Sequence, residues 1–361
     1  MKSQTPDKSE ELSKSAFDTN IDGNDVKLFY LKNEYLSVAI TNYGARIVSL
    51  EVKDKNNHTV DVSAGFDSII PYTLGRETYF GAVVGRYANR IANGKFSLNN
   101  QSYSLPINSD KHHLHGGTKG FSRVVWQVKK IDPAQLILQY LSKDGEEGYP
   151  GNLMVEISYT LSKNILEINY EAVTDNATIL NLTNHTFFNL NGFGKGNINR
   201  HLLKIYAHEF TPIDESMIPT GAIISVEDTP FDFREFSTLG THIDDDTNPQ
   251  IRYGKGFDHN FVLDKKEPSF QKCAEVIGDL SGICMEVWTT EPGMQLYSGN
   301  FLDGTHVLKN GFKDDFRSAF CLETQHFPNA PNEKSFPSTE LFPGEIFRSK
   351  TSFVFNPGKS D

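Results

Sequence analysis

The sequence predicts an all-β fold, a large antiparallel β-sandwich with few short helices. Runs in which apolar and polar residues alternate, the period of a half-buried strand, recur along the chain. Turn sequences rich in Gly, Pro, Asn and Asp separate these runs, and no segment keeps a helical period for ten residues or more. Many strands with this punctuation favour a sandwich or barrel of antiparallel sheet.

Four segments carry the strand signals. Residues 35–50 contain two strand signals around an Asn-Tyr-Gly turn. Residues 95–105 predict a hairpin with Asn99-Asn100 at the turn, where asparagine tolerates a positive φ. Residues 153–161 and 166–172 alternate in period two. The apolar faces predicted for these last two strands are Val155, Ile157, Tyr159 and Leu161, and Leu166, Ile168, Tyr170 and Ala172.

Helical and unstructured segments are few. The short helices that we expect are residues 67–74 and 232–238. Residues 1–20 are polar and mixed in charge, which predicts a disordered N-terminal tail. A length of 361 residues allows two domains, but no linker or repeat divides the chain. We therefore expect residues 21–361 to form a single domain.

Composition excludes several classes of partner. The net charge is −11 and no basic run occurs, which argues against nucleic acid and against an anionic membrane surface. No stretch approaches the ~18 apolar residues that suggest a membrane span. The polar N-terminus lacks the apolar centre of a signal peptide, so we expect a cytoplasmic protein. The alternative is an exported bacterial protein whose signal has been removed.

The cysteines and two N-glycosylation sequons indicate in which cellular compartment the protein is expected. Cys273, Cys284 and Cys321 are odd in number and lack CxxC spacing, which predicts reduced, buried thiols and no disulfide framework or zinc site. Asn181 and Asn184 stand in glycosylation sequons. A glycan there would cover the best candidate site, so a glycosylating secretory pathway is disfavoured.

His185 lies at the centre of the segment NLTNHTFFNL and is the first candidate for chemistry. Histidine can transfer a proton near neutral pH because its unperturbed pKa is about 6.5. The flanking Asn184 amide or Thr186 hydroxyl could fix its tautomer, and Phe187 and Phe188 offer aromatic faces that suit a sugar. The alternative is a structural strand histidine.

Four further segments place polar, titratable residues among Gly, Asn, Pro and aromatic residues. Each has a structural alternative: a surface ion pair for Arg90, a turn for His115, an Asx-turn for Asp258 and a salt bridge for Glu323. The segments are GRYANRI with Arg86, Asn89 and Arg90, LHGG with His115, FDHNF with Asp258, and ETQHFPN with Glu323.

Together these segments resemble the aldose 1-epimerase (galactose mutarotase) family. The resemblance extends from about residue 25 to residue 355, and it rests on GRYANRI, LHGG with a following KGF and Trp126, GYPGN, NHT-x-FNL, DHNF and ETQ-x-FPN-x-PN in this order. It implies a large β-sandwich that interconverts the α and β anomers of a free aldose such as galactose or glucose, without cofactor or metal.

The resemblance also implies roles for individual residues. His185 matches the family's general acid on the ring oxygen, and Glu323 matches the general base on the C1 hydroxyl. His115 matches a histidine that assists near the ring oxygen or binds hydroxyls. Arg90 and Asp258 match hydroxyl-binding residues, and Asn89 beside Arg90 is a further binding candidate. An acid and a base suffice to open a hemiacetal, and positioned proton transfer contributes ~10²–10⁴-fold.

Two departures from the family pattern leave the preferred sugar open. Phe187 stands where the motif commonly has tyrosine, and the segment before LHGG is rich in histidine, with His112 and His113. A metal site at this histidine cluster is disfavoured because no acidic or cysteine partner lies at ligand spacing. Residues 192–196 are glycine-rich, but they precede no helix and favour a loop over a nucleotide cradle.

The sequence leaves alternatives to a free-sugar epimerase. A hexose-6-phosphate 1-epimerase would need an arginine cluster for phosphate, and a non-catalytic carbohydrate-binding module would bind sugar without exchanging anomers. A glycosidase could use Glu323 and Asp258 as its carboxylate pair. Whether the protein is a monomer or a homodimer is open.

Overall fold

The structure, a computed structural model, describes residues 11–74, 79–264 and 269–358. The predicted all-β sandwich is confirmed, because strands dominate these residues and the two α-helices have four and six residues. The strands of the three largest sheets pair antiparallel throughout.

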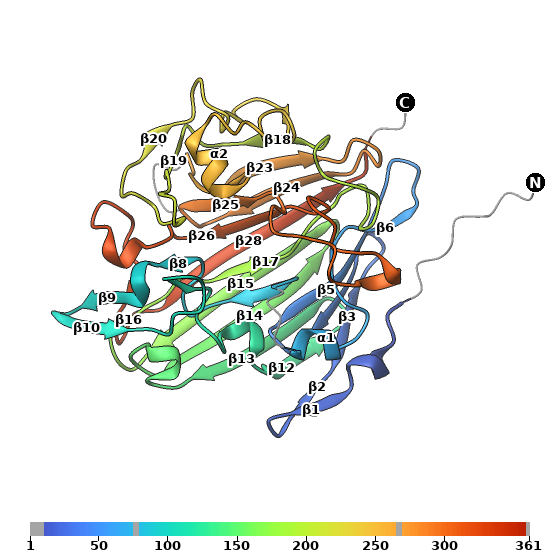
Figure 1. The fold of residues 1–361 in the computed structure, drawn as a ribbon. Helices are drawn as coiled ribbons and strands as arrows, with labels where there is room; N and C mark the ends of the chain where they lie inside the picture. Colours follow the sequence, from blue (N-terminus) through green and yellow to red (C-terminus); the bar gives the residue numbers. More distant parts are fainter. Residues whose placement is uncertain (1–10, 75–78, 265–268, 359–361) are drawn as a thin grey trace, which may run out of the picture.

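The largest sheet has nine strands and forms one layer of the sandwich (Figure 1). β14 and β15 bury the two faces predicted from their alternation, which confirms both strands. The strand order is β12 (Gln127–Asp132), β13 (Gln135–Ser142), β14 (Leu153–Ser162), β15 (Ile165–Thr174), β28 (Phe347–Asn356), β24 (Cys284–Thr289), β23 (Gln271–Ile277), β18 (Leu202–Ile205) and β21 (Ser237–Thr238).

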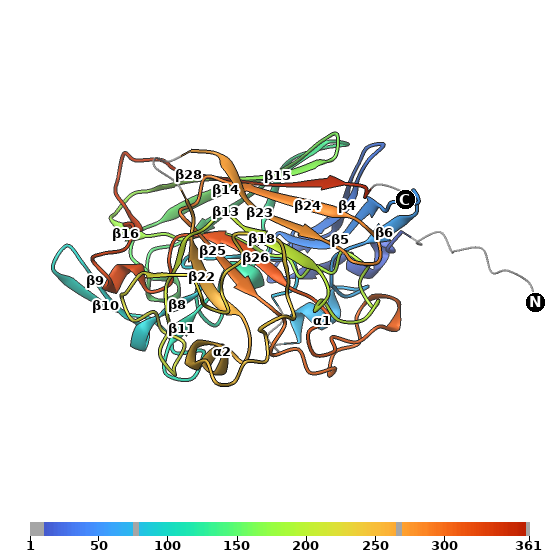
Figure 2. The same ribbon diagram turned by 90° about the horizontal axis from the view of Figure 1, so that it is seen from above.

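A second layer lies beneath this sheet (Figure 2). Its five-stranded sheet has the order β20 (Ile224–Ser225), β19 (Glu209–Phe210), β22 (Asp258–Val262), β25 (Gly293–Tyr297) and β26 (Cys321–Gln325). A four-stranded sheet has the order β3 (Leu28–Lys32), β4 (Ser37–Thr41), β5 (Arg46–Lys53) and β6 (Thr59–Asp61). β4 and β5 are the two strands predicted within residues 35–50.

Short strand pairs complete the architecture, and the predicted hairpin of residues 95–105 is one of them. The pairs are β1 (Thr19–Ile21) with β2 (Asn24–Val26), β7 (Ala82–Val84) with β17 (Thr183–His185), β8 (Arg90–Ile91) with β11 (His113–Leu114), β9 (Lys95–Leu98) with β10 (Gln101–Ser104), and β16 (Thr178–Ile179) with β27 (Glu340–Leu341).

The main hydrophobic core fills the space between the nine-stranded and five-stranded sheets. Phe261, Met294 and Leu322 of the five-stranded sheet share one buried cluster with Ile157 and Phe353 of the nine-stranded sheet. Removal of this apolar surface from water stabilises the two layers against each other. The opposite face of the five-stranded sheet is thereby left available for polar groups.

The helices differ in part from expectation. Within the expected helix of residues 67–74 the α-helix is α1 (Ile70–Thr73). The expected helix of residues 232–238 is wrong: the segment bends and then forms β21. The buried Phe231 and Phe233 alternate with polar residues, and the Phe233 carbonyl accepts a hydrogen bond from the Ile205 N–H, so local pairing wins over helix formation.

One α-helix was not expected. α2 (Pro249–Gly254) begins after Asn248, whose side chain accepts hydrogen bonds from the N–H groups of Gln250 and Ile251. This asparagine cap with proline at the first helical position is a start signal that is visible in the sequence. The short 3-10 segments are Lys14–Phe17, Ala92–Gly94, Phe121–Arg123, Glu146–Gly148, Lys309–Gly311 and Ala330–Asn332.

The expected disordered tail of residues 1–20 is wrong for its second half. Residues 1–10 lie outside the described residues, whereas from residue 11 the chain packs on the four-stranded sheet. The Tyr30 hydroxyl donates to the Leu12 carbonyl at 2.7 Å, and Phe17 is fully buried. An apolar anchor in a polar segment is enough to order it. Among the described residues, no helix has the length and apolarity that crossing a membrane requires.

Candidate active site

Alternate residues of β22, β25 and β26 form a polar face on the five-stranded sheet. The register sets Gln295 directly opposite both Asn260 and Glu323. Because successive side chains of a strand point to opposite faces, the residues between these face the core. The polar face consists of Asp258, Asn260, Gln295, Tyr297, Cys321, Glu323 and Gln325.

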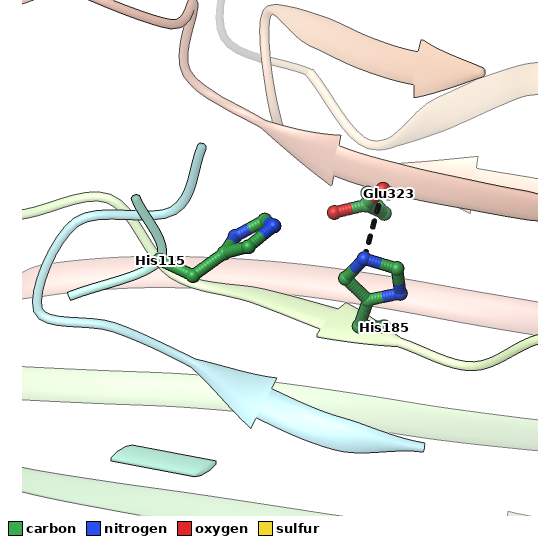
Figure 3. Close-up of side chains that lie close together, drawn as sticks. All are labelled: His115, His185 and Glu323. Atoms are coloured by element: carbon green, nitrogen blue, oxygen red, sulfur yellow. Dashed lines mark ion pairs between the residues drawn. The ribbon is translucent and has the colours of Figure 1, made fainter. Parts of the chain in front are cut away.

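His185 reaches this face from the neighbouring β17. β17 pairs with β7, where His185 lies opposite Ala82. The imidazole stacks between two aromatic rings, with centroid distances of 5.6 Å to Tyr79 and 4.8 Å to Phe187 and interplanar angles of 18° and 17°. These two contacts fix the plane of the ring, which points one nitrogen towards Glu323 (Figure 3).

His185 and Glu323 form a close buried pair. His185 Nε2 lies 3.6 Å from Glu323 Oε1, and the two residues are 6% and 2% exposed. Burial lowers the pKa of His185 to about 3, with its own backbone carbonyl opposing and Arg46 adding to the shift. Burial and the neighbouring Asp258 carboxylate raise the pKa of Glu323 well above its usual value, against the effect of Arg90. Both shifts favour the uncharged forms.

His115 faces the same pair from the loop after β11. Its N–H donates to the Asn89 carbonyl at 3.0 Å, and the Asn89 N–H donates to His115 Nδ1 at 3.2 Å. Both residues have positive φ, and a Cβ on the next residue, Gly116, would lie 1.8 Å from the Gly85 carbonyl oxygen. Burial lowers the pKa of His115 well below its usual value. The neutral ring therefore carries its proton on Nε2, which is free to donate.

Arg90 and Asp258 bring opposite charges to the site. The Arg90 charge lowers the pKa of both Asp258 and Glu323, although burial is the larger effect and raises the pKa of each. Asp258 Oδ1 accepts a hydrogen bond from Gln295 Nε2 at 2.7 Å. The Asn89 side chain accepts from the Arg90 N–H at 2.9 Å, which fixes the start of β8.

All six residues singled out from the sequence line one cavity of about 260 Å³. These residues, brought together from five separate segments, are His185, Glu323, His115, Asp258 and the adjacent Asn89 and Arg90. Phe187, whose aromatic face the sequence indicated, also lines the cavity and stacks on His185. The lining residues that the sequence did not single out are Tyr79, Phe80, Leu114, Tyr297, Phe301, Leu302, Asp303, Thr305, His306 and Asp314.

Residues 301–314 form one wall of this cavity, and a buried lysine anchors them. Lys309 Nζ lies 2.6 Å from Asp61 Oδ2 and 2.5 Å from the Val48 carbonyl oxygen. Lys309 is 3% exposed, although it sits in a surface loop. Within the loop, His306 Nδ1 lies 2.6 Å from Asp314 Oδ2. The wall is therefore fixed to the four-stranded sheet by charge and hydrogen bonds.

Comparison with known proteins places this site in a family. The family model described as aldose 1-epimerase matches residues 27–354. The chain belongs to the aldose 1-epimerase family. Among its curated relatives, galactose mutarotase of Homo sapiens is 44% identical over 335 residues, which cover 92% of this chain and 95% of the human protein. Aldose 1-epimerase of Escherichia coli (strain K12) is 33% identical over 340 residues, covering 92% and 96%.

Solved structures agree with this assignment. An aldose epimerase homologue from C. elegans matches with a TM-score of 0.86 at 30% identity, covering 92% of this chain and all of the other. Galactose 1-epimerase from Lactobacillus acidophilus matches with a TM-score of 0.81 at 28% identity, covering 94% and 97%. This chain is an enzyme of the aldose 1-epimerase type.

In this aldose 1-epimerase, the sequence neighbours of His185 do not fix its tautomer, contrary to expectation. The Thr186 hydroxyl donates to Asn184 Oδ1, and Asn184 Nδ2 donates to the Gly81 carbonyl. Alternation along β17 turns both side chains away from the face that His185 occupies. The side chain in contact with His185 Nδ1 is instead Cys321, with its sulfur 3.4 Å away.

Other motif residues of this aldose 1-epimerase are structural. The Arg86 guanidinium is buried and donates to Ser142 and to the carbonyls of Lys143 and Pro150. His113 contacts the Tyr149 hydroxyl at 2.6 Å and the Pro106 carbonyl at 2.7 Å. These contacts join the GRYANRI, LHGG and GYPGN segments.

His112, the other histidine before LHGG, has a plain structural setting. His112 Nδ1 accepts from the Asn93 N–H. All three cysteines are free, as predicted, with Cys273 and Cys321 buried and Cys284 partly exposed.

Among the described residues of this aldose 1-epimerase, two groups of side chains lie close enough to be considered for a metal: Asp303 with His306 and Asp314, and a group that includes the acid–base pair. The ligand atoms of His115, His185 and Glu323 all lie within 4.8 Å of one another. A neutral histidine that binds a metal through Nε2 carries its proton on Nδ1, which then needs an acceptor. His115 Nδ1 instead accepts the N–H of Asn89. The donor set therefore fits a proton-transfer site better than a metal centre.

Proposed function

We propose that this enzyme interconverts the α and β anomers of a free aldohexose such as galactose or glucose, with Glu323 as general base and His185 as general acid. The observation that carries the proposal is the 3.6 Å approach of His185 Nε2 to Glu323 Oε1 inside the cavity. A base and an acid on either side of a hemiacetal are the two groups that its opening needs.

The reaction follows from these two positions. Glu323 removes the proton of the C1 hydroxyl while His185 delivers a proton to the ring oxygen, and the bond between C1 and the ring oxygen breaks. Rotation about the C1–C2 bond presents the other face of the aldehyde. The ring closes when His185 takes the proton back and Glu323 returns one to the new C1 hydroxyl. No proton is consumed overall.

The electrostatics of the pair support this exchange. The pKa shifts of His185 and Glu323 favour an uncharged imidazole beside an uncharged carboxyl group. Transfer of one proton from Glu323 to His185 gives the reactive carboxylate and imidazolium without a change in total charge. The resting and reactive forms therefore interconvert inside the buried cavity, where a net change of charge would be costly.

The neighbouring groups suit a polyhydroxylated substrate. His115 presents an Nε2–H donor, because its Nδ1 is occupied by the Asn89 N–H. Arg90 supplies several N–H donors, and Asp258 supplies a carboxylate, groups that pair with vicinal hydroxyls.

Among the described residues, Glu323 Oε2 and Gln295 Oε1 are buried without a hydrogen-bond partner. Substrate hydroxyls would satisfy such groups. We therefore assign hydroxyl binding to Arg90, Asp258, Asn89 and His115.

A phosphorylated hexose fits the cavity less well. Arg90 is the one arginine or lysine among the described residues that line it, whereas four carboxylic acids do so. These acids are Asp258, Asp303, Asp314 and Glu323. Acidic groups outnumber the single basic group in this lining, which disfavours a phosphate group, so a free sugar is the better substrate.

The direct test is polarimetry on freshly dissolved α-galactose and α-glucose. Micromolar protein should speed the change in rotation well beyond the buffer rate, and His185→Asn should remove most of this acceleration while sugar binding persists in calorimetry. No acceleration by the unmodified protein would reject the proposed reaction.

The same samples separate the alternatives. Faster exchange of glucose 6-phosphate than of glucose would indicate the phosphorylated substrate. Binding without anomer exchange would indicate a carbohydrate-binding module. Release of nitrophenol from a nitrophenyl glycoside would indicate a glycosidase that uses Glu323 and Asp258.

A further inference from the structure

The second ring nitrogen of His185 has a buried sulfur as its neighbour. Cys321 Sγ lies 3.4 Å from His185 Nδ1, and Cys321 is fully buried. Cys321 lies two residues before Glu323 on β26, so both side chains project from the same face of the sheet. In Figure 3 one ring nitrogen of His185 faces Glu323, and the other points away from it.

We propose that Cys321 is a positioning residue of the reaction, whose sulfur accepts the Nδ1–H of His185 and so keeps Nε2 as the nitrogen that faces the substrate and exchanges the proton. The proposal rests on the proposed role of His185 as general acid. Cys321 itself does not touch the reacting atoms, and its effect acts through the orientation and the tautomer of the imidazole.

The aromatic stack alone leaves the ring orientation unsettled. Tyr79 and Phe187 lie nearly parallel to the imidazole and fix its plane. A half-turn about χ2 keeps that plane and exchanges the positions of ring nitrogens and carbons, and χ2 of histidine is roughly two-fold. After such a turn a C–H group would face Glu323. A hydrogen bond to Nδ1 distinguishes the two orientations, and Cys321 supplies it.

The thiol also selects the tautomer. Burial, with the charges of Glu323 and Asp258, raises the pKa of Cys321 well above its usual value, so the sulfur keeps its proton. The protonated sulfur accepts the Nδ1–H of His185, so Nε2 of the neutral ring keeps the lone pair that receives the proton from Glu323. The same contact persists in the imidazolium, because Nδ1 keeps its proton while Nε2 gains and loses the exchanged one.

Three variants test this role. Cys321→Ala removes the hydrogen-bond partner of His185 Nδ1, and kcat should fall about 3- to 10-fold, the size expected for one hydrogen bond, with KM little changed. Cys321→Ser keeps a donor and acceptor of similar size, and it should restore most of kcat. Cys273→Ala removes another buried thiol, in β23 outside the cavity, and should leave kcat unchanged.

Nitrogen-15 spectra of histidine-labelled protein give a readout that does not depend on turnover. The unmodified protein and Cys321→Ser should show neutral His185 in the Nδ1–H form, whereas Cys321→Ala should show both tautomers. An unchanged tautomer and an unchanged kcat in Cys321→Ala would overturn the positioning role. If neither the unmodified protein nor any variant exchanges anomers, the proposed reaction is wrong. The tautomer spectra would still show whether Cys321 positions the His185 ring.

Discussion

His185 Nε2 approaches Glu323 Oε1 to 3.6 Å, and the ring of His185 is held there by aromatic contacts on both faces. The two groups sit on different sheets, so their spacing depends on the packing of β17 against β26. Because burial favours the uncharged form of each group, the pair is expected to hold one proton over a wide range of pH. Coupled groups of this kind titrate as a pair.

The pH profile of anomer exchange should therefore have a broad plateau. On the acid side activity falls only when the pair gains a second proton, which the His185 pKa of about 3 delays. On the alkaline side it falls when the pair loses its only proton, which the raised pKa of Glu323 delays. The measurement is kcat/KM by polarimetry after subtraction of the buffer rate. A narrow bell with both limbs between about pH 5 and about pH 7, near unperturbed histidine, would contradict this account.

Glu323→Gln should reduce kcat by ~10²–10⁴-fold, because the amide keeps the shape of the side chain and cannot accept the C1 proton. KM should change little, since Arg90, Asp258 and His115 remain. Retention of more than a tenth of kcat, measured by polarimetry, would place the base elsewhere.

The same variant should be more stable than the unmodified enzyme at alkaline pH. The folded-state pKa of Glu323 lies above its unfolded value, so its favourable contribution is present at acid pH and is lost as the pH rises. Glutamine removes this loss. Urea unfolding near pH 4 and pH 8 should show a stability gain for Glu323→Gln that is larger at the higher pH, by the linkage of proton binding to folding. An equal effect at both pH values would speak against a raised pKa.

Parts of this fold and site could be predicted from the sequence. Period-two runs fixed β14 and β15 and their buried faces because a half-buried strand imposes that period on its side chains. The six site residues indicated by the resemblance all line the cavity. They could be predicted because they lie in recognisable motifs at turns or strand ends.

Other features carry no local signal. Tyr79 precedes a short strand and shows no periodicity, although it stacks on His185. Cys321 lies 136 residues from His185, so only the packed sheets reveal their contact. The expected helix of residues 232–238 failed because Phe231 and Phe233 alternate within a segment too short for a reliable period. Long-range packing decides all of these positions.

A buried histidine should make the protein sensitive to acid. His259 is fully buried, its Nδ1 accepts the Asp258 N–H, and burial lowers its pKa to about 3. The unfolded chain takes up a proton below about pH 6.5, whereas the folded chain does not, so stability is lost as the pH falls through this range. His259→Gln cannot take up this proton.

The measurement is the slope of unfolding free energy against pH between about 4.5 and about 6, from urea titrations. His259→Gln should reduce this slope by up to about 1.4 kcal/mol per pH unit, which is the value for one proton. The reduction is smaller near the upper end of the range, where the unfolded histidine is only partly protonated. Parallel slopes in the two proteins would show that His259 is protonated in the folded state.

The buried Lys309 should matter for both stability and substrate binding. Lys309→Met leaves Asp61 without its cation. The lysine is buried and Asp61 is partly exposed, so the cost should lie below the ~3–5 kcal/mol of a fully buried ion pair. Residues 301–314 should loosen from the four-stranded sheet, which raises KM for the sugar. Lys313→Met, an exposed position in the same loop, serves as control and should change neither quantity. If the two variants have the same unfolding free energy in urea and the same KM by polarimetry, Lys309 does not anchor the loop.

The pleat of β26 sends Glu323 to the cavity and its neighbours Leu322 and Thr324 towards the core. A slip of one residue would exchange these positions, since strand side chains have a period of two. Enzyme activity therefore reports on the register of β26. An insertion that shifts β26 by one residue would abolish turnover and disrupt the core at the same time. Engineered insertions, such as tags or recognition loops, belong in the connecting turns away from the cavity, for example at the exposed Gly145.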